Sequence, residues 1–351
     1  MTTDAQTELA EQLDQQAEWC ERLGSKLYAT LLTESARNAQ NGGPVWSALG
    51  DHFPAPLLEV MLPLRFMAAM HSLVLRDRAP ELARFYPSVG GDGRPDDAWP
   101  SFLSALESNT DEVHALSGHP VQTNEVGRCA ALIGGFLRIA HDTGKPLRML
   151  EVGSSAGLNL RWDRYHYESP AGSWGSSDSP VRMSWDAPPP HLDARVEVAD
   201  RRGCDPSPLN PLDENDRIRL LSAVWPDQLE RVERTRGAFA EASSVPVELD
   251  KAPAMTWLPE LLDQPADGLV TVVFHSIVLQ YLPDRERAEF LQLIEEAGAR
   301  ATTRTPLAHL TLEPDPGMSG FPVRLRMWPN GDEVILAQSG PHGSGITWTS
   351  C

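Results

Sequence analysis

The spacing of apolar side chains divides the chain into two parts. Through residue 143 they recur every three to four positions, which is typical of amphipathic helices, and no run has the alternation of a strand. We predict helices over residues 5–40, 56–78, 101–116 and 124–143, with a glycine- and proline-containing loop over residues 87–100. The pattern therefore predicts an all-helical N-terminal domain over residues 1–145.

From residue 146 onward, short apolar runs alternate with helical segments. The predicted strands cover residues 147–152, 195–199, 245–249, 269–274 and 307–312, and the predicted helices lie near residues 156–165, 213–242, 255–263 and 284–299. Such alternation is typical of a parallel sheet that is covered on both faces. Two more strands, 324–328 and 333–337, flank an Asn-Gly pair and predict a hairpin. The predicted fold class of residues 146–351 is α/β, a Rossmann-like, mostly parallel sheet with an antiparallel C-terminal strand pair.

The most informative motif follows the first predicted strand. Glu151 stands at the end of that strand, and the small residues 153–157 (Gly-Ser-Ser-Ala-Gly) come next. Small residues let the backbone approach a ligand, and the N-terminus of a following helix favours negative charge. The triple glycine spacing of dinucleotide-binding proteins is absent. A turn without a ligand is the alternative interpretation.

The order acid-Val-Gly-Ser-Ser-Ala-Gly resembles the first motif of S-adenosylmethionine (SAM)-dependent methyltransferases. The resemblance implies that the amino-acid end of SAM is held by Glu151, Gly153, Ser154, Ser155 and Gly157. It also implies an acid for the ribose after the second strand and an acid near the adenine after the third.

Two residues are candidates for the ribose acid, Asp200 and Asp205. We favour Asp205 because residues 203–207 look like a Gly-x-Asp-x-Ser motif. Asp250 is the candidate for the adenine contact. Each of these acids taken alone is more often a solvated loop residue, but acids at three successive strand ends favour a ligand site.

The interval between Gly153 and Asp205 is much longer than the roughly 20 residues usual in this fold. Residues 166–194 therefore predict an insertion, and we expect a hairpin there with a short strand near residues 182–185. The insertion could form a lid over the site or an inert excursion on the surface.

The fourth strand of the predicted sheet ends at His275. In methyltransferases this position lies beside the transferred methyl group, so the resemblance makes His275 both a cofactor contact and a candidate general base. The alternative is a histidine that bonds to a neighbouring loop. Methyl transfer does not always need a base, because positioning can supply much of the rate. Tyr281, farther along the same segment, is a candidate substrate contact.

A second polar motif covers residues 121–128 in the predicted helical domain. Thr123 or Asn124 can cap the following helix. Capping leaves the neighbouring polar residues unexplained, and the functional interpretation places them at the cofactor crevice. The catalytic candidates here are Glu125 and Arg128, and the candidate substrate contacts are Gln122, Asn124 and Arg128.

The charge and the cysteines limit the possible partners. Lys and Arg number 30 against 49 Asp and Glu, a net charge of −19 that disfavours nucleic acids and anionic membranes. No apolar run approaches the length of a membrane span. The four cysteines are scattered, as in reduced cytoplasmic proteins, and no His, Cys and acid set has the spacing of metal ligands. We predict a cytoplasmic protein with a small-molecule substrate and no metal; the oligomeric state is left open.

Several motifs together resemble one family along nearly the whole chain, from about residue 56 to 348. They cover residues 121–128, 151–165, 202–205, 224–228 and 274–283, and they are similar to the bacterial family called domain of unknown function 2332. The expected function is a SAM-dependent methyltransferase acting on an O, N or carboxylate group of a small molecule. The alternative is a protein that binds SAM or a nucleotide on the same fold without methyl transfer, as another enzyme or as a regulatory binding protein.

Overall fold

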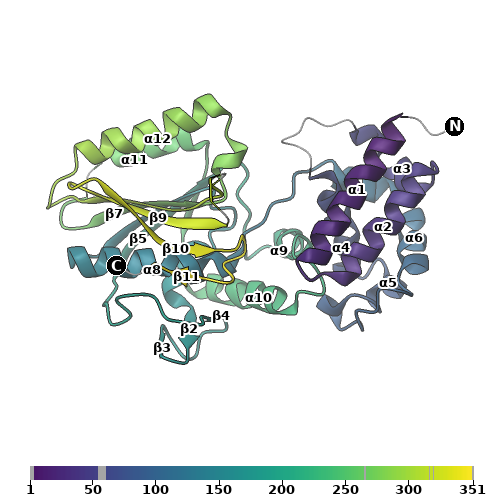
Figure 1. Cartoon of the computed structure of the whole chain (residues 1–351), viewed down its shortest axis with the longest axis horizontal. Coiled ribbons are helices and arrows are strands. Elements are labelled where there is room, and N and C mark those ends of the chain that lie inside the picture. Colours follow the sequence, from purple (N-terminus) through teal and green to yellow (C-terminus); the bar gives the residue numbers. More distant parts are fainter. Residues whose placement is uncertain (1–3, 54–60, 265, 316, 319, 350–351) are drawn as a thin grey trace. The chain divides into compact units, whose positions relative to one another are not determined.

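The structure, a computed structural model, describes residues 4–53, 61–264, 266–315, 317–318 and 320–349 (Figure 1). The chain forms two compact units, and each contains two separate stretches of sequence. The first unit comprises Met1–Thr123 and Asp213–Glu233; the second comprises Asn124–Leu212 and Arg234–Cys351. This division differs from the predicted one, because residues 124–145 belong with the sheet and residues 213–233 belong with the helices.

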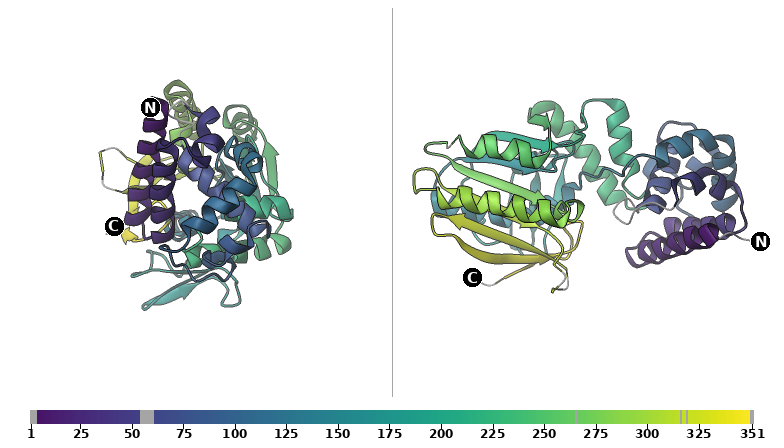
Figure 2. Two further views of the ribbon diagram at one scale, coloured as in Figure 1. Left: turned by 90° about the vertical axis from the view of Figure 1, so that its right-hand side faces the viewer. Right: turned by 90° about the horizontal axis from the view of Figure 1, so that it is seen from above.

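The described part of the first unit is helical. Its α-helices are α1 (Asp4–Arg22), α2 (Lys26–Gln40), α3 (Pro44–Leu49), α4 (Leu62–Leu75), α5 (Pro80–Ala83), α6 (Trp99–Ser108), α7 (Thr110–Ser117) and α9 (Glu214–Ser222). The single helix predicted over residues 5–40 is two helices, α1 and α2, which lie side by side (Figure 2). Gly24 adopts a left-handed φ of 87° between them, and the Ser25 side chain caps α2.

The helix predicted over residues 56–78 begins at Leu62, while its first positions, residues 56–60, lie outside the described residues. Its Met67 and Met70 are fully buried and fill the core of the first unit, as the apolar spacing predicts.

The two stretches of the first unit are joined by a partly buried polar contact. The Ser25 hydroxyl donates to Asp227, 2.7 Å from Oδ1, and the backbone N–H of Leu27 donates to Asp227 Oδ2 at 3.3 Å. Trp225, two residues before this acid, belongs to the same core as α1, α2 and α4. A stretch that stands between strands of the sheet in the sequence therefore completes the helical core.

The second unit is built on an eight-stranded sheet. Its strands are β1 (Leu147–Val152), β5 (Val198–Asp205), β6 (Glu248–Lys251), β7 (Val270–Ser276), β8 (Leu307–Leu312), β9 (Phe321–Trp328), β10 (Asp332–Ser339) and β11 (Thr347–Trp348). The order is β11-β10-β9-β8-β7-β1-β5-β6, in which β6, β5, β1, β7 and β8 are parallel. The remaining three strands pair in antiparallel fashion, so the C-terminal part contains one more strand than the predicted pair.

Helices cover both faces of this sheet (Figure 1). α8 (Cys129–Thr143) packs against β8, β9 and β10 on one face, and α11 (Ala254–Leu262) and α12 (Asp284–Ala299) cover the other. Gly135 brings α8 close to the strands: a Cβ there would lie 2.3 Å from Leu310 Cδ1. The helix predicted over residues 213–242 is two helices, α9 and α10 (Leu229–Ser244). In the described parts of the chain, no helix combines the length and apolar character needed to cross a membrane.

The insertion between β1 and β5 forms a small sheet of its own instead of a hairpin. β2 (His166–Ser169) lies between β3 (Gly172–Trp174) and β4 (Arg182–Ser184), the strand expected near residues 182–185. The Trp185 indole then donates to the Ala130 carbonyl at 2.9 Å, which fixes the end of this sheet to the first turn of α8.

We expect Asp227→Ala to destabilise the helical unit, because Ser25 and the Leu27 N–H would lose their buried acceptor. The expected loss is about 1–3 kcal/mol in the free energy of unfolding, measured by urea denaturation. Asp96→Ala removes an exposed acid of the same unit and is the matched control. Equal stability of the two variants would contradict a joining role for Asp227.

Candidate functional site

The strand order changes direction at the carboxyl end of β1, the position at which doubly wound sheets form a ligand crevice. From β1 the chain proceeds to β5 and β6 on one side, and β7 and β8 lie on the other side. Doubly wound sheets bind ligands outside the carboxyl ends of their strands at this change of direction. Glu151 stands there, paired in register with Gly203 of β5 and Phe274 of β7.

The turn after β1 has an unusual backbone. Gly153, Ser155 and Gly157 have φ values of 70°, 52° and 65°, a region that side chains other than glycine rarely adopt. Gly153 also allows a close approach, since a Cβ there would lie 2.6 Å from Val278 Cγ2. The α-helix predicted over residues 156–165 is absent; only the 3-10 helix η5 (Asn159–Arg164) forms, because the left-handed residues postpone helical geometry. The anion-favouring N-terminus of a long helix is therefore missing from this turn.

Two side chains hold the turn by its backbone N–H groups. Asn124 Oδ1 accepts from Ala156 N at 3.2 Å and from Leu158 N at 2.9 Å, and Asp205 Oδ2 accepts from Ser155 N at 3.0 Å. The Gly153 and Ser154 N–H groups both donate to the Cys204 carbonyl. These donors are used within the protein, so a ligand at this turn would be recognised through side chains and carbonyl groups.

Glu151 differs from these groups because one of its polar atoms has no hydrogen-bond partner among the described residues. Its side chain is 2 % exposed, and Oε2 has no hydrogen-bond partner among the described residues. Burial raises the pKa of Glu151 well above its usual value and Asp205 adds to the rise, while a hydrogen bond from Asn159 and the charges of Arg128 and Arg161 oppose it. A buried carboxyl group with an unused oxygen is suited to a cationic group of a ligand.

The structure distinguishes the acids that sequence reasoning left open. Asp205 ends β5 at the crevice, whereas Asp200 lies within that strand, opposite Arg148 and 3.9 Å from its Nε. Asp250 is engaged inside the protein: its Oδ2 accepts from Arg202 at 2.8 Å and from the Trp257 indole at 2.6 Å.

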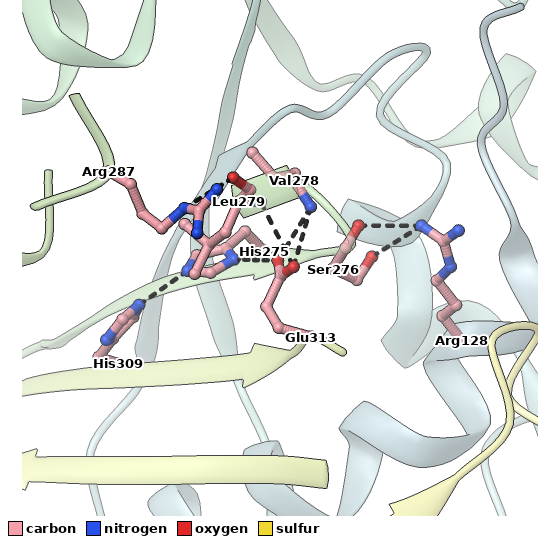
Figure 3. Close-up of polar contacts among 8 residues, drawn as sticks. All are labelled: Arg128, His275, Ser276, Val278, Leu279, Arg287, His309 and Glu313. Atoms are coloured by element: carbon pink, nitrogen blue, oxygen red, sulfur yellow. Dashed lines mark hydrogen bonds and ion pairs between the residues drawn. The ribbon is translucent and has the colours of Figure 1, made fainter. Parts of the chain in front are cut away.

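His275 is buried, and its ring lies between Glu313 and His309 (Figure 3). Its ring is 0 % exposed; Nδ1 lies 2.6 Å from Glu313 Oε1 and Nε2 lies 3.0 Å from His309 Nε2. Burial lowers the pKa of His309 well below its usual range, and His275 and Arg326 lower it further, so His309 is neutral. Because both nitrogens of His275 face protein groups, the ring has the geometry of a positioning residue and no open route to an acceptor.

Glu313 uses the same carboxylate to hold the loop after β7. It accepts from Val278 N at 2.9 Å and from Leu279 N at 3.3 Å (Figure 3). Between β7 and these residues, Ile277 has a φ of 55°, which is a genuine outlier for a β-branched side chain. Left-handed non-glycine residues therefore follow both β1 and β7, and such strain concentrates at functional sites.

Arg128 connects this loop to the C-terminal part of the chain. Its Nη1 donates to the Ser276 carbonyl at 2.9 Å, and its Nε donates to the Pro341 carbonyl at 3.1 Å (Figure 3 shows the Ser276 contact). Gly343 makes the approach possible, because a Cβ there would lie 2.0 Å from the Gly127 carbonyl oxygen.

The same approach brings together two polar residues that the sequence did not pair. His342 Nδ1 lies 3.5 Å from Oε2 of the buried Glu125, whose Oε1 accepts from Gly127 N at 3.0 Å. Arg234 Nη1 lies 4.0 Å from Glu125 Oε1. The glycines around His342 were the sequence signal of a close approach, but they are equally typical of a surface turn.

Two predicted substrate contacts have other surroundings in the structure. Gln122 belongs to the helical unit, where it lines a cavity of about 240 Å³ together with Arg65, Arg76 and Arg219. Tyr281 is 58 % exposed on the 3-10 helix η6 (Leu279–Tyr281). The site that the structure assembles in the second unit thus contains Asn124, Glu125, Arg128, Glu151, the turn and Asp205, with His342 added.

Comparison with known families agrees with the motifs from which this site is built. The model of the DUF2332 family, described as uncharacterized protein conserved in bacteria, matches residues 10–348. The chain belongs to this family. No curated protein and no solved structure matches the chain. The DUF2332 match includes both units and every element of the site, from Asn124 to His342.

We expect Asn124→Ala to loosen the turn, because Ala156 and Leu158 would lose their shared acceptor. Hydrogen exchange should accelerate at these two amides by about tenfold, which corresponds to roughly 1.4 kcal/mol. Thr123→Ala, at the exposed neighbouring position, is the control. Unchanged exchange at both amides in the Asn124 variant would show that the turn does not depend on this side chain.

We expect Glu151→Gln to raise stability at alkaline pH. The folded-state pKa is raised above the ordinary 4.5, so the stability that Glu151 contributes is present below 4.5 and is lost as pH rises through the folded-state value. The neutral amide avoids this loss, so the melting temperature should exceed that of the unaltered protein by roughly 2–4 °C at pH 8, the change that 1 kcal/mol produces in a domain of about 200 residues. The difference should shrink toward pH 4.5; a difference independent of pH would contradict a buried ionisable Glu151.

Proposed function

We propose that this DUF2332 protein is a SAM-dependent methyltransferase that acts on an O, N or carboxylate group of a small molecule. The observation that carries the proposal is Glu151, a buried carboxyl with an unused oxygen at the point where the sheet changes direction. The β6-β5-β1-β7-β8 order corresponds to the 3-2-1-4-5 order of doubly wound nucleotide-binding sheets. The same fold occurs in proteins with many different activities, so the support for methyl transfer has to come from the residues of the site.

The residues present fit the cofactor at its amino-acid end. Glu151 Oε2 would accept from the ammonium group, which would also keep the buried carboxylate ionised. Asp205 lies at the end of β5, where its oxygens accept from the backbone N–H groups of Ser155 and Ser207, and the same carboxylate would accept from the ribose hydroxyls. When bound, SAM supplies an activated methyl group; the protein supplies position and exclusion of water.

His342 and Glu125 take the role of base that the sequence assigned to His275. A carboxylate beside Nδ1 favours the tautomer in which Nδ1 carries the proton, and Nε2 is then the basic nitrogen of the neutral ring. Arg128 would attract an acidic acceptor. His275 acts through Glu313 on the loop after β7. A carboxylate acceptor would need no base at neutral pH.

The alternative function is binding of SAM or a nucleotide without methyl transfer. Two observations favour it: the N–H groups of the turn are used internally, and Val278 approaches Gly153 closely. A bound cofactor in such a protein would serve another reaction or a regulatory role.

Isothermal titration with SAM and with its demethylated product tests cofactor binding. We expect both to bind the full chain, and Glu151→Gln to weaken SAM binding about 10- to 100-fold, since a charge-assisted hydrogen bond contributes roughly 1.5–3 kcal/mol. Asp200→Asn is the matched control, an acid of β5 away from the crevice, and should bind as the unaltered protein does. Absence of binding by folded protein would overturn the proposal.

Methyl transfer is tested with labelled SAM and a set of small alcohols, amines and carboxylic acids. We expect His342→Asn to lower kcat for alcohol or amine acceptors and to leave SAM affinity unchanged. We expect His275→Gln to act mainly by destabilising the loop after β7. Binding of SAM without label transfer to any acceptor would favour the alternative function.

A further inference from the structure

Three potential metal ligands meet at the end of α8. His141 and Asp142 lie in the last turn of α8, and His191 comes from the segment that follows β4. One ligand atom of each residue lies within 4.8 Å of the other two. Residue spacing did not indicate this cluster, because His191 is separated from the other two residues by β1, the turn and the small sheet.

The contacts within the cluster already resemble those of a binding site. His141 Nδ1 lies 2.9 Å from Asp142 Oδ1, and the imidazoles of His141 and His191 stack with centroids 4.0 Å apart. Two adjacent ligands of an ion with bonds of about 2.1 Å stand about 3 Å apart, so this pair needs little movement. Arg138 Nε donates to the other carboxylate oxygen, Asp142 Oδ2, which orients the carboxylate and leaves Oδ1 toward the histidines.

The backbone of His191 supplies an independent observation. Its φ is 60°, a left-handed conformation that residues with a side chain rarely adopt. That conformation directs the imidazole of an otherwise irregular segment onto His141.

We propose that His141, Asp142 and His191 bind one divalent transition metal ion of the zinc type, with water in the remaining positions. Two imidazoles and one carboxylate are nitrogen and oxygen ligands typical of zinc and of cobalt or nickel in its place. The ion would attach the segment after β4 to the last turn of α8. Trp185 already attaches the start of that segment to the first turn, at Ala130, so the segment would be held along the length of the helix.

Titration of the full chain with Zn²⁺ alone, at pH 7.5, tests the site. We expect one ion to bind, and His191→Ala and Asp142→Asn each to weaken binding at least tenfold. The matched control is His52→Ala, which breaks another stacked histidine pair, His52 and His114, whose ring nitrogens contact backbone carbonyls. Loss of binding in the control alone, or unchanged binding in His191→Ala, would overturn the proposal.

Cobalt provides a second measurement that does not depend on stability. Bound Co²⁺ should give visible absorption bands that are lost in both ligand variants and retained in His52→Ala, and circular dichroism should confirm that each variant is folded. Zn²⁺ should also slow proteolysis between residues 186 and 194 in the unaltered protein and not in His191→Ala. No absorption change on adding Co²⁺, or equal proteolysis with and without Zn²⁺, would overturn the proposal. Titration with SAM is a separate measurement, so either proposal can fail alone.

Discussion

The side-chain oxygen of Asn124 accepts two hydrogen bonds from the turn after β1, and the geometry of the candidate site depends on this contact. It places residues 124–128 against the turn, and Arg128 then reaches the end of β7 and the Pro341 carbonyl. Segments from the start, middle and end of the second unit are thereby fixed around one strand end. A single amide does this because its carbonyl oxygen has two acceptor positions.

Four acids at or near the carboxyl ends of the parallel strands differ in whether their oxygens accept hydrogen bonds. Asp205, Asp250 and Glu313 accept hydrogen bonds from protein groups, and these bonds offset the cost of withdrawing charge from water. Glu151 has burial without full compensation, so it opposes stability at neutral pH. Buried ionisable groups that lower stability are concentrated at functional sites. Glu151 is therefore stronger support for a ligand site than the acids whose oxygens accept hydrogen bonds from the protein.

The elements with strong apolar periodicity were predictable from sequence. β1, β8 and α12 have the bounds that the pattern gives, because continuous burial of one strand or one helix face leaves a clear signal. β5 was placed too early because its sequence is rich in charge; Arg201 and Arg202 find their partners, Asp163 and Asp250, in other elements.

What the sequence missed depends on contacts between distant residues. His275 is enclosed by His309 of β8 and by Glu313, which directly follows β8. The residues near His275 in the sequence do not indicate these partners. The left-handed Ser155, which prevents the predicted helix, is held by Asp205 on the neighbouring strand. The sequence pattern predicts Glu151 near the end of a strand, as β1 has it. That its Oε2 has no hydrogen-bond partner among the described residues depends on the folded structure and has no signal in the sequence.

The interleaving of the two units has a consequence for synthesis on the ribosome. The helical core includes Trp225, and the hydrogen-bond partner of the Ser25 hydroxyl is Asp227. The N-terminal helices therefore cannot complete their unit until more than half of the chain has been made. By then β1 and β5 have been made without β7, which pairs with the other edge of β1. The nascent chain therefore carries two unfinished cores at once, and completion of the helical unit precedes that of the sheet.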